Sequence, residues 1–466
     1  MKKIINLLIV AGLVLTLGLQ SCNQESWLEP TLATAKSYET GIKSQEDVWG
    51  LLLGAYDRMT AVPYYGRNFI IYGEVRSDNC FSNGNSGRFV AVSQRTMTAD
   101  DGYAAGTWAQ IYRVIANANI VIAQDPDKLS GDKDLIREYI GQAYAIRALA
   151  HFDLLKLYGE QHVKGGEQNL GIPYITKYKG GDLYPARNTV QEDKEMIYKD
   201  LDEALKYMKP EYNDPSKEYI TTWAVYALKS RVAIYFGDWQ IAKDAAEQVI
   251  NSGEYKICDA DQFAATFSKK GTENVIFELA ERATDNNGIN GLSYIYRGKN
   301  YGDIQVVDSF KDIFDSTDVR GLGGGAIAYD DQGKLRNIVK YPSNPNFDYD
   351  IPIIRYEEVI LNYAEALYHL GQTAEALKYL NMIPAHRDAH LYTGINEDTI
   401  LLERRKELAF EGFRFDDLAR THHSVPVYNT AGILEKTLPY GDYRYAFPIP
   451  REEINANKNM VQNLGY

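Results

Sequence analysis

The sequence predicts a mainly α-helical fold, in which a scaffold of helical repeats carries long irregular loops and minor β-structure. Apolar residues recur three and four positions apart through much of the chain beyond Ser44, which is typical of amphipathic helices. Two stretches repeat one helix-turn-helix pattern, and this indicates a repeat architecture. Between the helical stretches lie long segments rich in Gly, Asn, Asp, Tyr and Pro that show no helical period.

The N-terminus has the layout of an exported and lipidated protein. The first 21 residues combine a basic start with an apolar run that is too short to span a bilayer, as in a signal peptide. Residues 19–22 (Leu-Gln-Ser-Cys) resemble a bacterial lipobox, in which the signal is cut before the cysteine and the thiol is lipidated. We expect lipidation at Cys22, a lipid-anchored tether over 22–43 and one domain over 44–466. A plain signal peptide with an incidental cysteine is the alternative.

A helix is predicted over 137–159, where apolar residues form two neighbouring stripes. Arg147 and His151 lie one turn apart inside this broad apolar arc. A buried arginine needs a carboxylate partner and a buried histidine needs a hydrogen bond. The pattern therefore predicts that Arg147 is buried in an ion pair and that both residues are structural.

The repeated pattern occupies 222–252 and 357–383. In each stretch a glycine, Gly237 or Gly371, ends one helix and an alanine follows five positions later. This arrangement is typical of a tetratricopeptide hairpin, where glycine allows a tight turn and alanine allows close helix packing. A further unit is expected over 140–209, with an inserted segment between its two helices.

Two long segments, 63–101 and 269–352, are predicted to be loop insertions in this scaffold. Loops of this length inside a compact domain are usually functional. The net charge of -13 repels phosphate backbones, so nucleic acid is not an expected partner.

Motif searches give no sign of catalysis or metal binding. The chain contains no H-E-x-x-H, Walker A or G-x-S-x-G motif, and no C-x-x-C motif or Cys/His cluster. We expect no catalytic residue, no cofactor and no metal site. Cys80 and Cys258 could form a disulfide, but two buried free thiols are the preferred interpretation.

Four blocks of sequence resemble one known family. They are IGQAYAIRALAHFDLLKLYG (140–159), RYEEVILNYAEAL (355–367), ERRKELAFEGFRFDDL (403–418), and FPIP (447–450) followed by Asn457, Asn459, Gln462-Asn463 and Gly465-Tyr466. In this order, and with the lipobox, they are similar to the SusD/RagB family of nutrient-binding outer-membrane lipoproteins of Bacteroidetes.

The resemblance implies a SusD-like tetratricopeptide scaffold whose loops form the ligand face. It implies a lipid-anchored protein of the outer membrane, facing the cell exterior, that sits on a SusC-like TonB-dependent barrel transporter and hands it oligosaccharides without catalysis. The matching blocks would be scaffold, held together by buried ion pairs. A peptide-binding, RagB-like member is the first alternative. A lipid-anchored glycoside hydrolase is the second, and it would need two carboxylates facing each other across a cleft.

Candidate ligand-binding residues come from the two long loop segments, the first extended to residue 103. Tyrosine and phenylalanine rings offer flat apolar faces to sugar C–H groups, while aspartate and arginine hydrogen-bond hydroxyl pairs. Any single one of them could instead be a packing or turn residue. The predicted set is Asp78, Arg88, Phe89, Tyr103, Tyr294, Tyr296 and Tyr301.

Overall fold

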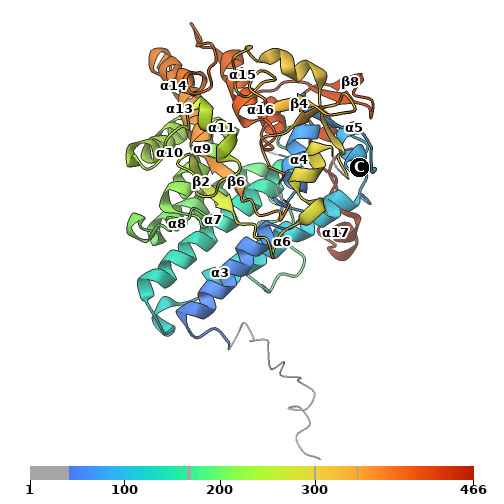
Figure 1. The fold of residues 1–466 in the computed structure, drawn as a ribbon. Helices are drawn as coiled ribbons and strands as arrows, with labels where there is room; N and C mark the ends of the chain where they lie inside the picture. The colour runs from blue at the N-terminus through green and yellow to red at the C-terminus, as the bar shows by residue number, and fades with distance from the viewer. Residues whose placement is uncertain (1–40, 165–168, 299–300, 344) are drawn as a thin grey trace, which may run out of the picture.

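The structure is a computed structural model that describes residues 41–164, 169–298, 301–343 and 345–466, and helices dominate it (Figure 1). The predicted signal peptide, the predicted lipidation site Cys22 and nearly all of the predicted tether lie outside the described residues. Within the described ranges, no helix combines the length and the apolar character that crossing a membrane requires.

Helices of very different length make up most of the chain. The α-helices are α3 (Gln45–Met59), α4 (Asn68–Val75), α5 (Val90–Gln94), α6 (Gly102–Ile122), α7 (Lys133–Tyr158), α8 (Val190–Tyr207), α9 (Thr222–Phe236), α10 (Trp239–Ser252), α11 (Phe263–Thr266), α12 (Leu292–Arg297), α13 (Tyr356–His369), α14 (Thr373–Ala385), α15 (Glu397–Leu408), α16 (Arg414–Arg420) and α17 (Arg451–Ala456). Short 3₁₀ turns are η1 (Pro126–Lys128), η3 (Pro210–Tyr212), η4 (Ala260–Gln262), η5 (Gly288–Asn290), η6 (Asp308–Ile313) and η7 (Tyr443–Tyr445).

The β-structure consists of small two-stranded antiparallel sheets. They pair β1 (Cys80–Ser82) with β3 (Ile304–Val306), β2 (Val275–Leu279) with β6 (Ile351–Arg355), β4 (Ile327–Tyr329) with β5 (Leu335–Asn337), and β7 (Val425–Tyr428) with β8 (Leu434–Leu438). The prediction of a mainly α-helical fold with minor β-structure is therefore confirmed.

Helix pairs form the scaffold along one side of the molecule, where α8, α10 and α14 lie beside α7, α9 and α13 (Figure 1). Between α9 and α10, Gly237 adopts a left-handed conformation with φ of 73°, and Gly371 does the same between α13 and α14 with φ of 78°. Residues that carry a side chain rarely adopt this backbone conformation, so both turns depend on glycine. The alanines five positions on, Ala242 and Ala376, are fully buried, as close packing of the second helix requires.

Arg147 and His151 hold α7 to its neighbours, as predicted. The guanidinium of Arg147 forms a buried bidentate ion pair with Asp200 of α8, with both N–O distances 2.7 Å. His151 Nε2 accepts a hydrogen bond from the backbone N–H of Ile175, so the other ring nitrogen donates to the Arg147 carbonyl. Burial lowers the pKa of His151 to about 3, which keeps the ring neutral.

A buried cluster of charged side chains, which we call the ionic core, joins α13 and α15 to the end of β6. Glu407 lies at its centre and accepts hydrogen bonds from Arg320, Arg355 and Arg387. The ionic core comprises Asp318, Arg320, Lys340, Arg355, Glu357, Arg387, Glu403, Glu407 and Glu411. Several members come from the two blocks at 355–367 and 403–418, so the expectation that these blocks carry buried ion pairs is confirmed.

The predicted loop segment 63–101 is more helical than expected, because it contains α4 and α5. Every residue of α4 is buried, including Glu74. A helix covered on all sides shows no alternation of apolar and polar faces, and this removes the signal on which the sequence prediction depends. The second segment, 269–352, contains strands, turns and the short helix α12.

Cys80 and Cys258 are free thiols, and Cys80 is fully buried while Cys258 is partly exposed. Burial raises the pKa of both thiols, to about 11 for Cys258, so neither is a thiolate near neutral pH.

Candidate functional site

The two predicted loop segments meet in a short antiparallel ladder. Strand β1 pairs with β3 through Cys80 opposite Val306, Phe81 opposite Gln305 and Ser82 opposite Ile304. This pairing places the 83–89 turn beside residues 301–303. We call the surface formed there by Asn85, Ser86, Arg88, Tyr103 and Tyr301 the loop surface.

Asp303 fixes the backbone of the loop surface from beneath. Its carboxylate accepts hydrogen bonds from the backbone N–H of Ser86 at 2.8 Å and of Arg88 at 3.2 Å, and from the Ser86 hydroxyl at 2.6 Å. The side-chain amide of Asn85 donates to the Tyr301 carbonyl at 3.0 Å. The exposed turn is therefore held in one position relative to Tyr301.

Arg88 and Tyr301 form a stacked pair on this support. The guanidinium carbon of Arg88 lies 3.6 Å from the centroid of the Tyr301 ring, and Nη1 donates to the Ser86 hydroxyl. Both side chains are half-buried. The pair presents a planar cation and a phenol hydroxyl from two segments of chain that only the fold brings together.

Tyr103 extends the aromatic surface from the first turn of α6. Its ring stacks on Phe89 with centroids 4.7 Å apart, and its hydroxyl accepts a hydrogen bond from the Phe89 backbone N–H at 3.3 Å. Phe89 itself has φ of 59° and a fully buried ring. Phe89 was predicted as a ligand contact, but its ring is covered and instead supports Tyr103.

Arg67 is a buried residue next to the loop surface that the sequence prediction did not name. It lies at the start of α4, with its guanidinium carbon 5.4 Å from the centroid of the Phe89 ring. Its Nη1 donates to the Asn290 carbonyl, and within the described part of the chain it forms no salt bridge. Burial lowers its pKa. Arginine beside a glycine in a turn carries no sequence signal for such a position.

Two other predicted contacts are structural, which corrects the prediction. The Asp78 carboxylate pairs with Arg414 at 2.7 Å and Arg405 at 3.1 Å. Burial raises the pKa of Asp78, but the hydrogen bond and charge of Arg414 together with the charge of Arg405 outweigh it and hold the value below its usual range. Tyr296 is fully buried, with its ring stacked on Tyr341.

Tyr294 lies apart from the stacked pair. It is half-buried, and its ring centroid is 5.4 Å from that of Phe347. Arg88, Tyr103 and Tyr301 are thus the predicted contacts that the structure brings together on the loop surface.

The chemistry of the loop surface suits recognition of a polar ligand. Planar guanidinium and phenol groups offer hydrogen bonds next to flat apolar faces. Its carboxylates are already committed, because Asp303 binds the 86–88 backbone and Asp101 caps α6 by accepting from the Tyr103 N–H. Neither is placed as a free acid or base.

Comparisons with known proteins agree with this architecture. Residues 334–466 match the sequence profile described as the SusD family, and residues 27–234 match the profile described as "Starch-binding associating with outer membrane".

Relatives match over the full length of the chain. SusD-like protein P38 of Formosa agariphila is 26% identical, with all of both chains covered. A crystal structure described as a putative sugar binding protein from Bacteroides vulgatus superposes with a TM-score of 0.83 at 29% identity, covering 92% of this chain and 100% of that one. The starch-binding protein SusD of Bacteroides thetaiotaomicron is 29% identical over 142 residues, covering 30% of this chain and 24% of that protein.

Fold and site together define a class: helical-repeat proteins that carry a polar aromatic surface on loops outside the repeats. The two profiles and the full-length relatives name that class. The chain belongs to the SusD/RagB family, whose members bind glycans and associate with the outer membrane.

Proposed function

We propose that the protein binds nutrient oligosaccharides at the loop surface and delivers them to a SusC-like TonB-dependent transporter, without catalysis. The observation that carries the proposal is the Arg88–Tyr301 stack, formed where the two long loop segments meet. The ring and the guanidinium provide a flat face with hydrogen bonds at its edge, which is the combination that sugar rings need.

The supporting side chains make this surface pre-organised. Asp303 holds the 86–88 turn, Asn85 bonds to the Tyr301 carbonyl, and Phe89 supports the Tyr103 ring. A ligand therefore meets a surface that loses little conformational entropy on binding. The family's description as starch-binding supports a glycan rather than a peptide as the ligand class.

Absence of catalysis is part of the proposal. A glycoside hydrolase needs two carboxyl groups about 5–10 Å apart that both face the scissile bond. The carboxylates nearest the loop surface, Asp303 and Asp101, bind backbone N–H groups, and Asp78 is neutralised by two arginines. No pair among these three is placed to share a substrate.

The test is calorimetry of the soluble form, residues 23–466, against a panel of starch, laminarin and short peptides. With the glycan that binds best, we expect Tyr301→Ala to weaken binding about tenfold or more, because the stacked face is lost. Tyr301→Phe keeps the face and should stay within a few-fold of wild type. Tyr329→Ala is the matched control, since Tyr329 is an exposed tyrosine on β4.

Two outcomes would overturn the proposal. If Tyr301→Ala and Arg88→Ala both bind the glycan as tightly as wild type, the ligand binds elsewhere. If the peptides bind and no glycan does, the peptide-binding alternative replaces the proposed function.

Anchoring and delivery need separate experiments. Cys22→Ala should abolish lipid labelling and membrane recovery, and unchanged labelling in this variant would contradict the lipobox interpretation. Affinity-tagged protein solubilised from native membranes should co-purify with a TonB-dependent barrel. If no barrel co-purifies at a stoichiometric level, the proposed delivery role is contradicted.

A further inference from the structure

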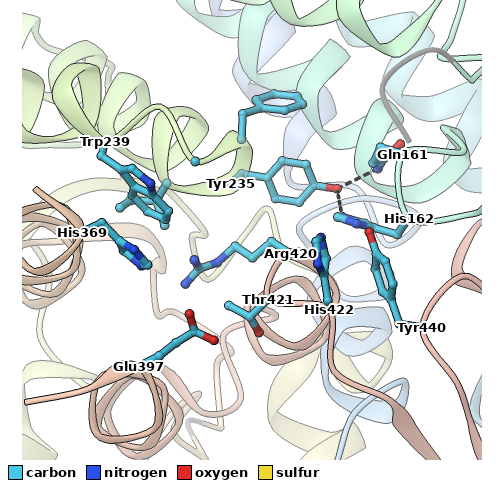
Figure 2. A pocket seen from close by; sticks show the side chains of 13 residues that line it. Gln161, His162, Tyr235, Trp239, His369, Glu397, Arg420, Thr421, His422 and Tyr440 are labelled. Carbon is cyan, nitrogen blue, oxygen red and sulfur yellow. Dashed lines mark hydrogen bonds between the residues drawn. The ribbon is translucent and has the colours of Figure 1, made fainter. Parts of the chain in front are cut away.

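A cavity lies on the scaffold, among residues that do not belong to the loop surface. Its volume is about 560 Å³, and α9, α13 and α16 all end at its wall (Figure 2). Helices α10 and α15 begin there, with Trp239 and Glu397 as their first residues. We call this cavity the helix-end pocket. It shares no lining residue with the loop surface.

The wall of the helix-end pocket offers both donors and acceptors of hydrogen bonds. Several of the last carbonyl groups of α9, α13 and α16 already accept hydrogen bonds from the turns that follow, as Ala233 does from Asp238 and Leu367 from Gln372. Glu397 adds a carboxylate at the edge. The charge of Arg420, which crosses the pocket, is offset by a bidentate pair with Glu365 and a further bond to Asp417. The pocket therefore suits a ligand whose polar groups both donate and accept hydrogen bonds.

His162 and His369, two of the lining residues, are neutral near pH 7, so each ring has one donor and one acceptor nitrogen. Burial lowers the pKa of His162 to about 3, and it also lowers the pKa of His369. Neutral imidazole offers one ring nitrogen as an acceptor. His162 Nε2 lies 2.9 Å from the Tyr235 hydroxyl, which also accepts a hydrogen bond from Gln161 Nε2 at 2.7 Å.

Two ring pairs form facing walls. The Trp239 indole stacks on the His369 imidazole with centroids 3.8 Å apart and planes at 9°, and His422 lies 4.3 Å from Tyr440. Figure 2 shows the first pair on one side of the pocket and the second on the other, with Arg420 between them. Flat rings on two sides, with the guanidinium of Arg420 between them, suit a flat ligand that has an apolar face and a polar rim.

We propose that the helix-end pocket is a second saccharide site that takes one or two sugar units. A pyranose ring has an apolar C–H face for stacking, and hydroxyl groups around its rim that both donate and accept hydrogen bonds. These match the ring pairs and the polar side chains of the lining respectively. The cavity volume lies in the range of small-molecule sites, about 300–1,000 Å³, and exceeds what a single side chain would fill. This site goes beyond the proposed function, because it requires no contact with Arg88 or Tyr301.

Saturation-transfer NMR on the soluble form tests the proposal, with methyl glycosides of glucose, galactose, mannose and N-acetylglucosamine as probes at millimolar concentration. We expect at least one probe to bind, with a dissociation constant of about 1 mM. Trp239→Ala and His369→Ala should each weaken this binding at least fivefold. Thermal unfolding of each variant establishes that it is folded.

Matched variants separate the two sites. Trp223→Ala removes a half-buried tryptophan of α9 outside the pocket and should leave probe binding unchanged, as should the double variant Arg88→Ala/Tyr301→Ala. Failure of all four probes to bind, or binding that persists in folded Trp239→Ala and His369→Ala, would overturn the proposal. Loss of probe binding in the double variant alone would overturn it too, and would leave the proposed function standing.

Discussion

Arginine has different roles in the ionic core and on the loop surface. Arg387 is fully buried and pairs with Glu357 at 2.9 Å and Glu407 at 3.0 Å. Arg88 is half-buried, lies flat on Tyr301 and, among the described residues, forms no salt bridge. The remaining nitrogen of Arg387, Nη1, donates to the carbonyls of Cys258 and His386, so each nitrogen of this guanidinium has an acceptor and the side chain serves the fold. Where donors remain available beside an aromatic face, the side chain can serve a ligand.

The largest effect is expected in the ionic core. Arg387→Ala removes two ion pairs and leaves Glu357 and Glu407 short of a partner inside the protein. Breaking a buried pair in this way costs about 3–5 kcal/mol, so we expect that loss in urea unfolding, or failure to fold. A loss below about 1 kcal/mol would show that the ionic core adds little stability.

For Arg147→Ala we expect a smaller loss in the free energy of unfolding, about 3 kcal/mol. The variant leaves one carboxylate, Asp200, without its arginine partner, and Asp200 still accepts a hydrogen bond from Tyr174. Urea unfolding measures this loss. The matched control is Arg147→Ala combined with Asp200→Asn, which removes the unpaired charge and should recover part of the loss. If the double variant is less stable than Arg147→Ala, the unpaired carboxylate is not the cause.

The pH dependence of stability should contain two opposing contributions. Burial raises the pKa of Glu407, but the charges of Arg387, Arg355 and Arg320 hold it well below its usual range. Its contribution to stability is thus present above about pH 4.5, the unfolded value, and is lost as pH falls through the lower folded value. Glu138 is the reverse case, because burial raises its pKa to about 7.

Glu138 therefore provides a test with a defined pH window. Its stabilising contribution is complete below about pH 4.5 and is lost as pH rises through about 7. Glu138→Gln keeps an acceptor for the Lys209 backbone N–H and removes the titration. We expect the variant to gain stability relative to wild type between pH 5 and 8 by chemical denaturation. A stability difference that stays constant with pH would contradict the raised pKa.

The smallest effect on stability is expected at the loop surface. Arg88→Ala removes a half-buried side chain without unpairing a carboxylate, so unfolding should change by less than about 0.5 kcal/mol. Glycan affinity should nevertheless fall. A variant that loses both stability and binding would place Arg88 with the structural arginines, and the contrast between the two regions would fail.

The repeats could be predicted from sequence because their signals are local. Gly237 and Gly371 mark the turns, and the apolar arc around Arg147 predicts its burial without knowledge of Asp200. Helix α4 could not be predicted, because burial on every side removes the alternation of apolar and polar faces.

The loop surface was predicted only in part, because its formation depends on long-range contacts. Strands β1 and β3 have three residues each, too few for a recognisable pattern. Composition alone does not distinguish Tyr301, which faces Arg88, from Tyr296, which points into the interior from the six-residue helix α12. The burial of Phe89 and the position of Arg67 depend in the same way on contacts made across the fold.

The pairing of β1 with β3 has a consequence for how the protein matures. The Ser86–Asp303 hydrogen bond joins residues 217 positions apart, so this part of the protein cannot be completed until both distant segments have been synthesised and brought together. Contacts at such separation carry a large loop-closure cost and form slowly. Competence to recognise a ligand would then arise late in folding, and a partly folded chain would reach the membrane without it.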